Sequence, residues 1–385
     1  MREVAGDIFL EEDQLELRQI VRAFLGRHVD EASVRRQVET AERFDRSTWD
    51  RMTAELGLPA LAIPEDREGF GATALEVVVV AEELGAVLAP QPFLPAVLAA
   101  AGLVALDRAS SDSLASSDSL LQGIVRGEIV AVVPPRTAVG HLPGGQELRV
   151  EGTGTARRLH GYAHFVVNGA QADRFLVYAD APDGPVLLTL ASGERVRVEE
   201  RPCLDTTRPQ ASLIFDGVPA TVLASGVPAA AAWARAQRWG VLTLAAGEVG
   251  VARCCLEMSV EYAGVREQFG RLIGSQQSIK HHCTDMLIAL DLARVAVRDA
   301  AIAVRDERSD ADEAVHQARY LAQQAAELAT RDCIQVHGGI GFTWEHPAHL
   351  YFKRARADAS LLGSSRDQLD AFAALTLQPS TGSRI

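Results

Sequence analysis

The stretch YAGVREQFGRLIGSQQSIKHHCTDM, residues 262–286, decides the fold because it joins two long helical patterns. One helix is expected to end and the next to begin inside it. A guanidinium (Arg266), an aromatic ring (Phe269) and an amide (Gln277) gather at that joint. Core packing does not require such groups at a helix end, so their presence there needs another explanation.

Helical patterns continue on both sides of this joint. They cover 229–265, 276–304 and 311–337, break at Gly338–Gly339, and resume near Pro347. Long antiparallel helices with short connections predict a four-helix bundle. We therefore expect residues 223–385 to form a C-terminal four-helix bundle followed by a polar tail.

The middle of the chain has a different pattern. Between 128 and 222, short β-rich runs such as EIVAVVPP and HFVVNGA are separated by Gly, Pro, Asp and Asn. Strands this frequent, without helices between them, predict a small antiparallel barrel or sandwich. We assign residues 119–222 to this middle β-barrel domain.

Residues 1–118 are predicted to form an N-terminal α-helical domain, since their apolar residues recur at helical spacing. The tract ASSDSLASSDSL (109–120) is rich in small polar residues and predicts a loop at the boundary. The order is therefore helical, β and four-helix, an α+β architecture.

Composition limits the function. The 385 residues carry a net charge of −13, which argues against nucleic acid or an anionic membrane as the main partner. The five cysteines form no C-x-x-C pair, and the N-terminus is too acidic for a signal peptide, so a cytoplasmic location is expected. The longest apolar run, 94–106, is shorter than the roughly 20 residues of a membrane span.

Several common catalytic motifs are missing from the sequence. There is no G-x-G-x-x-G after a strand, no Walker loop, no G-x-S-x-G and no metal-ligand spacing. The run HHCTD (281–285) is one residue short of an acyltransferase motif, and its histidines are better explained as one facing solvent and one packing at a helix contact.

Two late motifs give the chain a resemblance to a known family. Residues 266–277 read Arg-x-x-Phe-Gly-x-x-Ile-x-x-x-Gln, and residues 335–347 read Gln-x-x-Gly-Gly-x-Gly followed by Glu-x-Pro. With ELGLPALAIPEDREGFGAT at 55–73, these motifs resemble the acyl-CoA dehydrogenase family across nearly the whole chain. The resemblance implies an FAD-dependent oxidoreductase that oxidises the α,β-bond of an acyl-CoA.

The resemblance also implies which residues meet FAD, and in the family they reach the cofactor of a neighbouring subunit. Arg266 would contact the pyrophosphate, since guanidinium and phosphate form charge-assisted bidentate contacts. Phe269 would pack against the cofactor, and glycines at 338 and 339 would let the backbone approach it closely. Two amides complete the expected cofactor site, Gln277 and Gln335.

The general base of the family is missing from both of its usual positions. Seventeen residues after Glu345 stands Leu362, and twenty-six residues before Arg266 stands Gly240. The flavin-contacting run of the family is replaced by Phe165–Val167. Glu248, farther along the helix of Gly240, is a weak candidate for a relocated base.

This pattern resembles the base-lacking subunits of bacterial α2β2 acyl-CoA dehydrogenases. We therefore expect a related base-bearing partner chain and a dimer of dimers. Two alternatives stay open: a self-sufficient homo-oligomer that uses a relocated base, and a redox-silent scaffold or repurposed family member.

Overall fold

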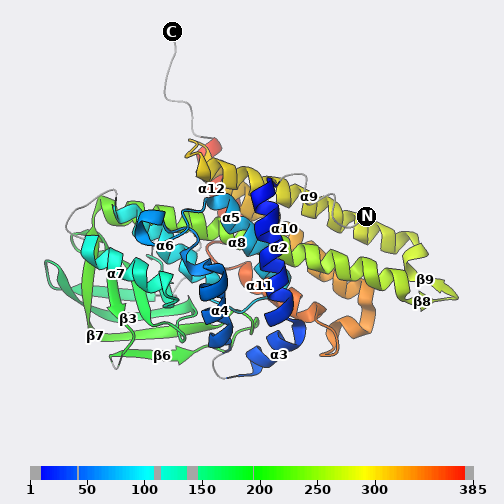
Figure 1. Ribbon diagram of the computed structural model, residues 1–385, viewed down its shortest axis with the longest axis horizontal. Helices are drawn as coiled ribbons and strands as arrows, with labels where there is room; N and C mark the ends of the chain where they lie inside the picture. The colour runs from blue at the N-terminus through cyan, green and yellow to red at the C-terminus, as the bar shows by residue number, and fades with distance from the viewer. Residues whose placement is uncertain (1–9, 41–42, 108–113, 137–145, 194, 378–385) are drawn as a thin grey trace, which may run out of the picture.

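The computed structural model describes residues 10–40, 43–107, 114–136, 146–193 and 195–377, and Figure 1 shows their arrangement. The N-terminal part is helical, as predicted. Its α-helices are α2 (Glu12–His28), α3 (Glu31–Glu39), α4 (Arg46–Leu56), α5 (Ala74–Ala86), α6 (Phe93–Asp107) and α7 (Leu114–Val125). Two single turns of 3₁₀-helix lie between α4 and α5.

Helices α5 and α6 connect the N-terminal part to the C-terminal bundle by packing against it. Thr73 and Glu76 form a capping box that fixes the start of α5. Most residues of both helices are apolar and buried, and both pack against α8 (Val227–Val265). Such all-round burial is expected of a helix inside a large core.

The loop predicted at 109–120 is wrong for its second half. Residues 108–113 lie outside the described residues, but α7 begins at Leu114 and continues past residue 118. The cause is tertiary: Leu120, Leu121 and Ile124 are buried in an apolar cluster that α7 shares with α6. Burial of three large apolar side chains outweighs the low helix propensity of the serines. How the chain divides into domains stays a prediction.

The middle part is a seven-stranded sheet in the order β1-β4-β5-β7-β3-β2, with β6 paired to the first half of β7. No hydrogen-bonded pair joins the two ends of this sheet among the described residues, although β2 contacts β4 and β1 contacts β3. The strands are β1 (Val130–Val133), β2 (Gln146–Glu151), β3 (Ala156–Val167), β4 (Arg174–Ala181), β5 (Gly184–Ala191), β6 (Val196–Glu200) and β7 (Gln210–Ser225).

One strand pair contradicts the prediction of a wholly antiparallel β-domain. β1 and β4 run parallel, with Val130 opposite Arg174, whereas the other pairs of this sheet are antiparallel. A parallel pair needs a long connection. Here β2 and β3 lie between β1 and β4 in the chain, and they occupy the other end of the sheet.

The C-terminal part is the predicted helical bundle. The three long helices pack on one another, and α11 and α12 complete the bundle around α10. In Figure 1 the joint between α8 and α9, with the small hairpin β8–β9, projects at the end of the bundle away from the sheet. The further helices are α9 (Gln277–Arg305), α10 (Ala311–His337), α11 (Ala348–Asp358) and α12 (Ser365–Thr376).

Helix α8 is also the one described helix that is long and apolar enough to cross a membrane. Of its most apolar window, 78% is buried inside the fold, as expected of the central helix of a globular core. The polar tail at 378–385 lies outside the described residues, and the cytoplasmic location stays a prediction.

Candidate functional site

The joint between α8 and α9 is built as a rigid projection. Arg266 is the C-terminal cap of α8, and its backbone N–H donates to the Tyr262 carbonyl over 2.9 Å. Next come β8 (Glu267–Gln268) and β9 (Arg271–Leu272), joined by Phe269 and Gly270. Both linking residues have positive φ, 55° and 73°, as in the tight turns that join antiparallel strands.

A small apolar cluster holds this projection against the end of α10. It contains Ala263 of α8, Ile273, and Val336 of α10, with Tyr262 and Ile279 packed beside them. The fold therefore brings the 266–277 motif and the 335–339 motif to one end of the bundle, although about 70 residues separate them in the chain.

At this end the side chains predicted to meet a cofactor face solvent. Arg266, Gln277 and Gln335 are exposed, and no hydrogen bond or ion pair occupies their side chains among the described residues. The ring of Phe269 is 92% exposed, and its positive φ is unfavourable for a residue with a side chain. Backbone strain that holds a large apolar ring in water is typical of a binding site.

The two glycines differ in what they require. Gly338 ends α10 with φ 63°, a conformation that favours glycine. Gly339 lacks such a φ, and a Cβ added there would meet nothing within 4 Å in this chain. Nothing among the described residues therefore requires glycine at 339.

His337, which the sequence analysis did not single out, supports this backbone. Its ring stacks on Tyr262 with centroids 4.4 Å apart and lies 4.1 Å from the ring of His346. Burial opposes its protonation, but contacts with Cys333, whose carbonyl lies 2.7 Å from Nδ1, raise the pKa of His337. The sequence spacing gives no signal for the stacking of His337 on Tyr262, because 75 residues separate the two rings in the chain.

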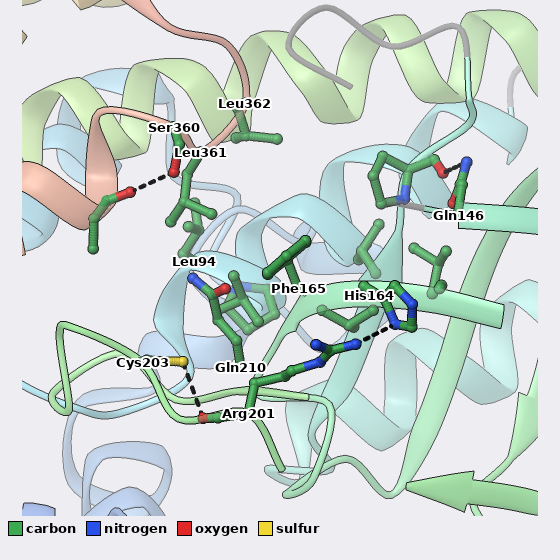
Figure 2. A pocket seen from close by; sticks show the side chains of 18 of the residues that line it. Leu94, Gln146, His164, Phe165, Arg201, Cys203, Gln210, Ser360, Leu361 and Leu362 are labelled. Carbon is green, nitrogen blue, oxygen red and sulfur yellow. Dashed lines mark hydrogen bonds between the residues drawn. The ribbon is translucent and has the colours of Figure 1, made fainter. Parts of the chain in front are cut away.

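A second feature is a cavity of about 410 Å³ between the sheet and the helices. Figure 2 shows Phe165 and Leu361 projecting into it from opposite sides, with Arg201 beneath Phe165 and directed toward His164. Among the described residues no aspartate or glutamate lines it. Its walls come from α6 (Leu94, Leu98), β1 (Val132, Val133), β3 (Ala163–Val167), Arg201–Leu204, Gln210 and the segment that contains Ala357 and Ser360–Leu362.

Of the two usual base positions, Leu362 lines the cavity, and Gly240 is buried directly behind Leu362 and Leu98. A Cβ built on Gly240 would lie 3.1 Å from Cδ1 of Leu362 and 2.3 Å from Cδ2 of Leu98. No side chain fits at 240 without movement of these leucines. Phe165, Val166 and Val167, where the flavin contacts were expected, line the same cavity.

Glu248 lies elsewhere, inside the bundle. Its carboxylate and the guanidinium of Arg319 form an ion pair in which both side chains are fully buried. Burial raises the pKa of Glu248 to about 8, although the positive charge of Arg319 acts in the opposite direction. Glu248 does not line the cavity, so the structure gives it no access to a ligand there.

Further buried ion pairs connect this region to the sheet. Arg319 donates to the Asp358 carbonyl over 2.7 Å, and Arg208 lies 2.8 Å from the Asp358 carboxylate. Arg354 pairs with Asp205 at 2.6 Å. Sequence reasoning missed this network because its partners come from distant elements.

The prediction for the HHCTD histidines, one facing solvent and one at a helix contact, is confirmed. His281 is exposed, and His282 contacts Asp332 of α10 at 2.9 Å.

Comparisons with known proteins agree with this architecture. The model of the acyl-CoA dehydrogenase N-terminal domain matches residues 11–128, and that of the acyl-CoA dehydrogenase C-terminal domain matches residues 231–375. The chain is 32% identical to acyl-CoA dehydrogenase IpdE2 of Mycolicibacterium smegmatis, over 94% of this chain and 97% of that protein.

Two solved assemblies are similar in structure. The ChsE4–ChsE5 complex from Mycobacterium tuberculosis has 29% identity and a TM-score of 0.84, over 96% of this chain and 99% of the matched chain. A Tcur3481–Tcur3483 steroid acyl-CoA dehydrogenase variant has 27% identity and a TM-score of 0.83, over 95% and 98%.

Proposed function

Because this chain belongs to the acyl-CoA dehydrogenase family of FAD-dependent oxidoreductases, we propose that it is the subunit without a general base in a hetero-oligomeric enzyme of this family. In this proposal a related partner chain supplies the base. Bound FAD supplies the hydride acceptor for α,β-dehydrogenation of an acyl-CoA.

The observation that carries the proposal is the environment of Gly240 and Leu362. Leu362 lines the cavity, Gly240 lies directly behind it, and neither residue can accept a proton. Proton abstraction from the α-carbon needs a group that can accept a proton within hydrogen-bond reach. The titratable groups that do line the cavity are His164, Arg201 and Cys203. Burial, followed by the charge of Arg201, lowers the pKa of His164, so it is a weak base.

A relocated base at Glu248 has less support. A general base must reach the proton that it removes, whereas Glu248 is enclosed by the bundle and bound to Arg319. The homo-oligomeric alternative would need a conformational change that breaks a buried ion pair. Such a break is expensive because it leaves a charge uncompensated.

The exposed end of the bundle supports the second half of the proposal, that this chain binds the FAD of its partner. Arg266 would bind the pyrophosphate with its guanidinium fork, and Gln277 and Gln335 would donate amide hydrogen bonds. Phe269 would cover an aromatic ring of the cofactor. The open space beside Gly339 fits close approach by a group from outside the chain.

An apolar stripe on α9 supports assembly. Leu287, Ile288, Leu292 and Val295 are 42–57% exposed although they are large and apolar. Exposed apolar surface of this kind marks protein–protein interfaces. The stripe follows the helix that begins at Gln277, so a partner seated on it would lie beside the exposed cofactor residues. A dimer of dimers is the assembly we expect, and the ChsE4–ChsE5 match is itself a complex.

Co-expression tests this proposal. The chain is produced alone and together with a base-bearing acyl-CoA dehydrogenase chain from its genomic neighbourhood. Flavin per protomer is measured by absorbance, and mass by light scattering. We expect the lone chain to be colourless and the complex to be a yellow tetramer with both chains. A lone chain that purifies with stoichiometric FAD would contradict the proposal, and the partner expressed alone is the control.

A further inference from the structure

We propose that the cavity bounded by α6, β3 and Ala357–Leu362 binds an apolar carboxylic acid, with Arg201 as the anchor for its carboxylate. This inference rests on the proposed function, because it takes the cavity of this chain to be free of flavin. It assigns a ligand class to a cavity that the proposed function leaves unused.

The shape and lining of the cavity favour an apolar ligand. Its volume of about 410 Å³ falls within the range of small-molecule sites. Most of the described lining side chains are apolar, and Arg201 lies beside His164 on one side of the cavity, while the polar Gln146 and Ser360 lie on other walls (Figure 2). A molecule with an apolar body and one polar end matches this division.

Arg201 provides a positive charge that no acid neutralises. Among the described residues no carboxylate lies within ion-pair distance of its guanidinium. Its Nε donates to Ser212, and one terminal nitrogen lies 3.0 Å from Nδ1 of His164. An arginine carries further N–H donors, which stay available to a ligand. A planar guanidinium fork matches a carboxylate with two parallel hydrogen bonds.

His164 and Gln210 complete the polar end. The lowered pKa of His164 keeps its ring neutral at pH 7, so its Nδ1 can accept from Ser212 or Arg201 and hold the guanidinium in place. No hydrogen bond occupies the side-chain amide of Gln210 among the described residues, so this amide can donate to the second carboxylate oxygen.

The backbone at the cavity is strained where it shapes the lining. The β3–β7 register shifts between Ala163 and Val166, and within this irregularity Phe165 has φ 61° and a ring 41% exposed toward the cavity. Leu362 on the opposite wall has φ 53°. Bulges and left-handed residues with side chains gather at ligand sites, where they direct side chains.

The charge argues for a monoanion rather than a phosphate-rich ligand. Arg201 is the one Lys or Arg among the described residues that line this cavity. Arg158, Arg195 and Arg197 face a separate groove on the sheet, where Arg197 already pairs with Glu199 at 3.1 Å. A single guanidinium above apolar walls binds one carboxylate, whereas a diphosphate would need more positive charge.

Calorimetric titration tests the inference. Decanoate is titrated into the lone full-length chain and into the co-expressed complex, with decanol as the uncharged match. Arg201→Ala should weaken decanoate binding by about ten- to a hundredfold, the usual effect of losing hydrogen bonds to a charged group. It should leave decanol binding unchanged. Arg197→Ala, an exposed arginine of the neighbouring groove, is the matched control and should bind decanoate like the parent.

Leu361→Trp provides a second route that keeps Arg201 intact. An indole at this wall should narrow the cavity and weaken binding of both probes, and a melting curve for each variant checks the fold. Decanedioyl-CoA is a third probe, because the free end of its acyl chain carries a carboxylate like that of decanoate. Comparing the two probes shows whether the site takes a free acid or the acid end of a CoA ester. Binding of either probe supports the site.

Equal binding of decanoate and decanol, or no effect of Arg201→Ala, would overturn the inference. A complex that retains flavin but does not bind decanoate would also overturn this inference. That outcome would leave the proposed function intact. If the lone chain purifies with FAD and decanoate displaces that FAD, the proposed function would be overturned instead.

Discussion

The exposed end of the bundle and the cavity beside the sheet differ in where each places its polar groups. At the bundle end, Arg266, Gln277 and Gln335 are exposed and Phe269 is almost wholly in solvent. At the cavity, Leu362 and Gly240 occupy the two base positions, and the lining lacks a carboxylate among the described residues. One region is equipped to bind something outside the chain, and the other lacks the group that the family reaction needs.

This difference teaches that one fold can carry the two halves of a composite site independently. The bundle end depends on a helix joint and a hairpin, whereas the cavity depends on contacts between three parts of the chain. Substitutions in the second region leave the first intact. A subunit that supports the cofactor of a partner requires only the first.

The largest expected effect concerns turnover, and it tests whether the cavity is inactive. The lone chain supplied with FAD should dehydrogenate acyl-CoA about 10²–10⁴-fold more slowly than the complex, the usual contribution of a positioned general base. Acceptor-coupled assays across chain lengths measure this ratio. Comparable rates in both preparations would remove the distinction between the two regions.

The next effect tests the bundle end. Arg266→Ala in the complex should weaken FAD retention by about thirtyfold to a few thousandfold, because a charge-assisted contact at an interface is lost. Flavin release during dialysis measures it. Arg366→Ala on exposed α12, far from the joint, should retain flavin like the parent. Unchanged FAD affinity in Arg266→Ala would show that this end does not bind the cofactor.

A smaller effect is expected at Gly339. An added methyl group meets open space within this chain, so Gly339→Ala should leave the melting temperature of the lone chain nearly unchanged. In the complex it should weaken FAD binding by about five- to a hundredfold, as overpacking by one methyl does. Gly338→Ala, whose φ is 63°, should instead destabilise the lone chain. A melting temperature lowered equally by both would contradict the distinction.

The buried carboxyl group of Glu248, which contacts Arg319 inside the bundle, should give a pH effect. Burial raises the pKa of Glu248 from 4.5 to about 8, so between these values the folded chain binds a proton that the unfolded chain releases. The free energy of unfolding should therefore fall as pH rises through this window, by at most about 1.4 kcal/mol per pH unit. Glu248→Gln should flatten that slope in denaturant titrations. Glu257→Gln on the exposed side of α8 is the control and should keep it.

The smallest expected effect is on activity in Leu362→Glu. This variant returns a carboxylate to one base position, but Leu98 and the apolar strand Phe165–Val167 still surround it. The lone chain should stay inactive in the acceptor-coupled assay. Turnover gained by this one substitution would mean that the cavity lacks only its base.

Local patterns were sufficient for much of the fold and for one of the two regions. Helical periodicity predicted α8, α9 and α10, and the stretch around Arg266 predicted a joint between two helices, because a helix end depends on neighbouring residues. The hairpin at this joint and its exposure came from the structure. Local reasoning failed at Leu114–Val125, where serines suggested a loop. It also failed at β1, whose parallel pairing with β4 depends on the path of β2 and β3.

The sequence by itself determined the family, the order of the three parts and the absence of glutamate at positions 240 and 362. The tertiary structure alone decided that these two positions are neighbours, that Glu248 is bound to Arg319, and that Arg201 has no carboxylate partner among the described residues. The physical reason is distance along the chain. Local spacing fixes which face of a helix or strand a residue occupies, but packing between remote elements fixes its neighbours, and with them its charge state and chemistry.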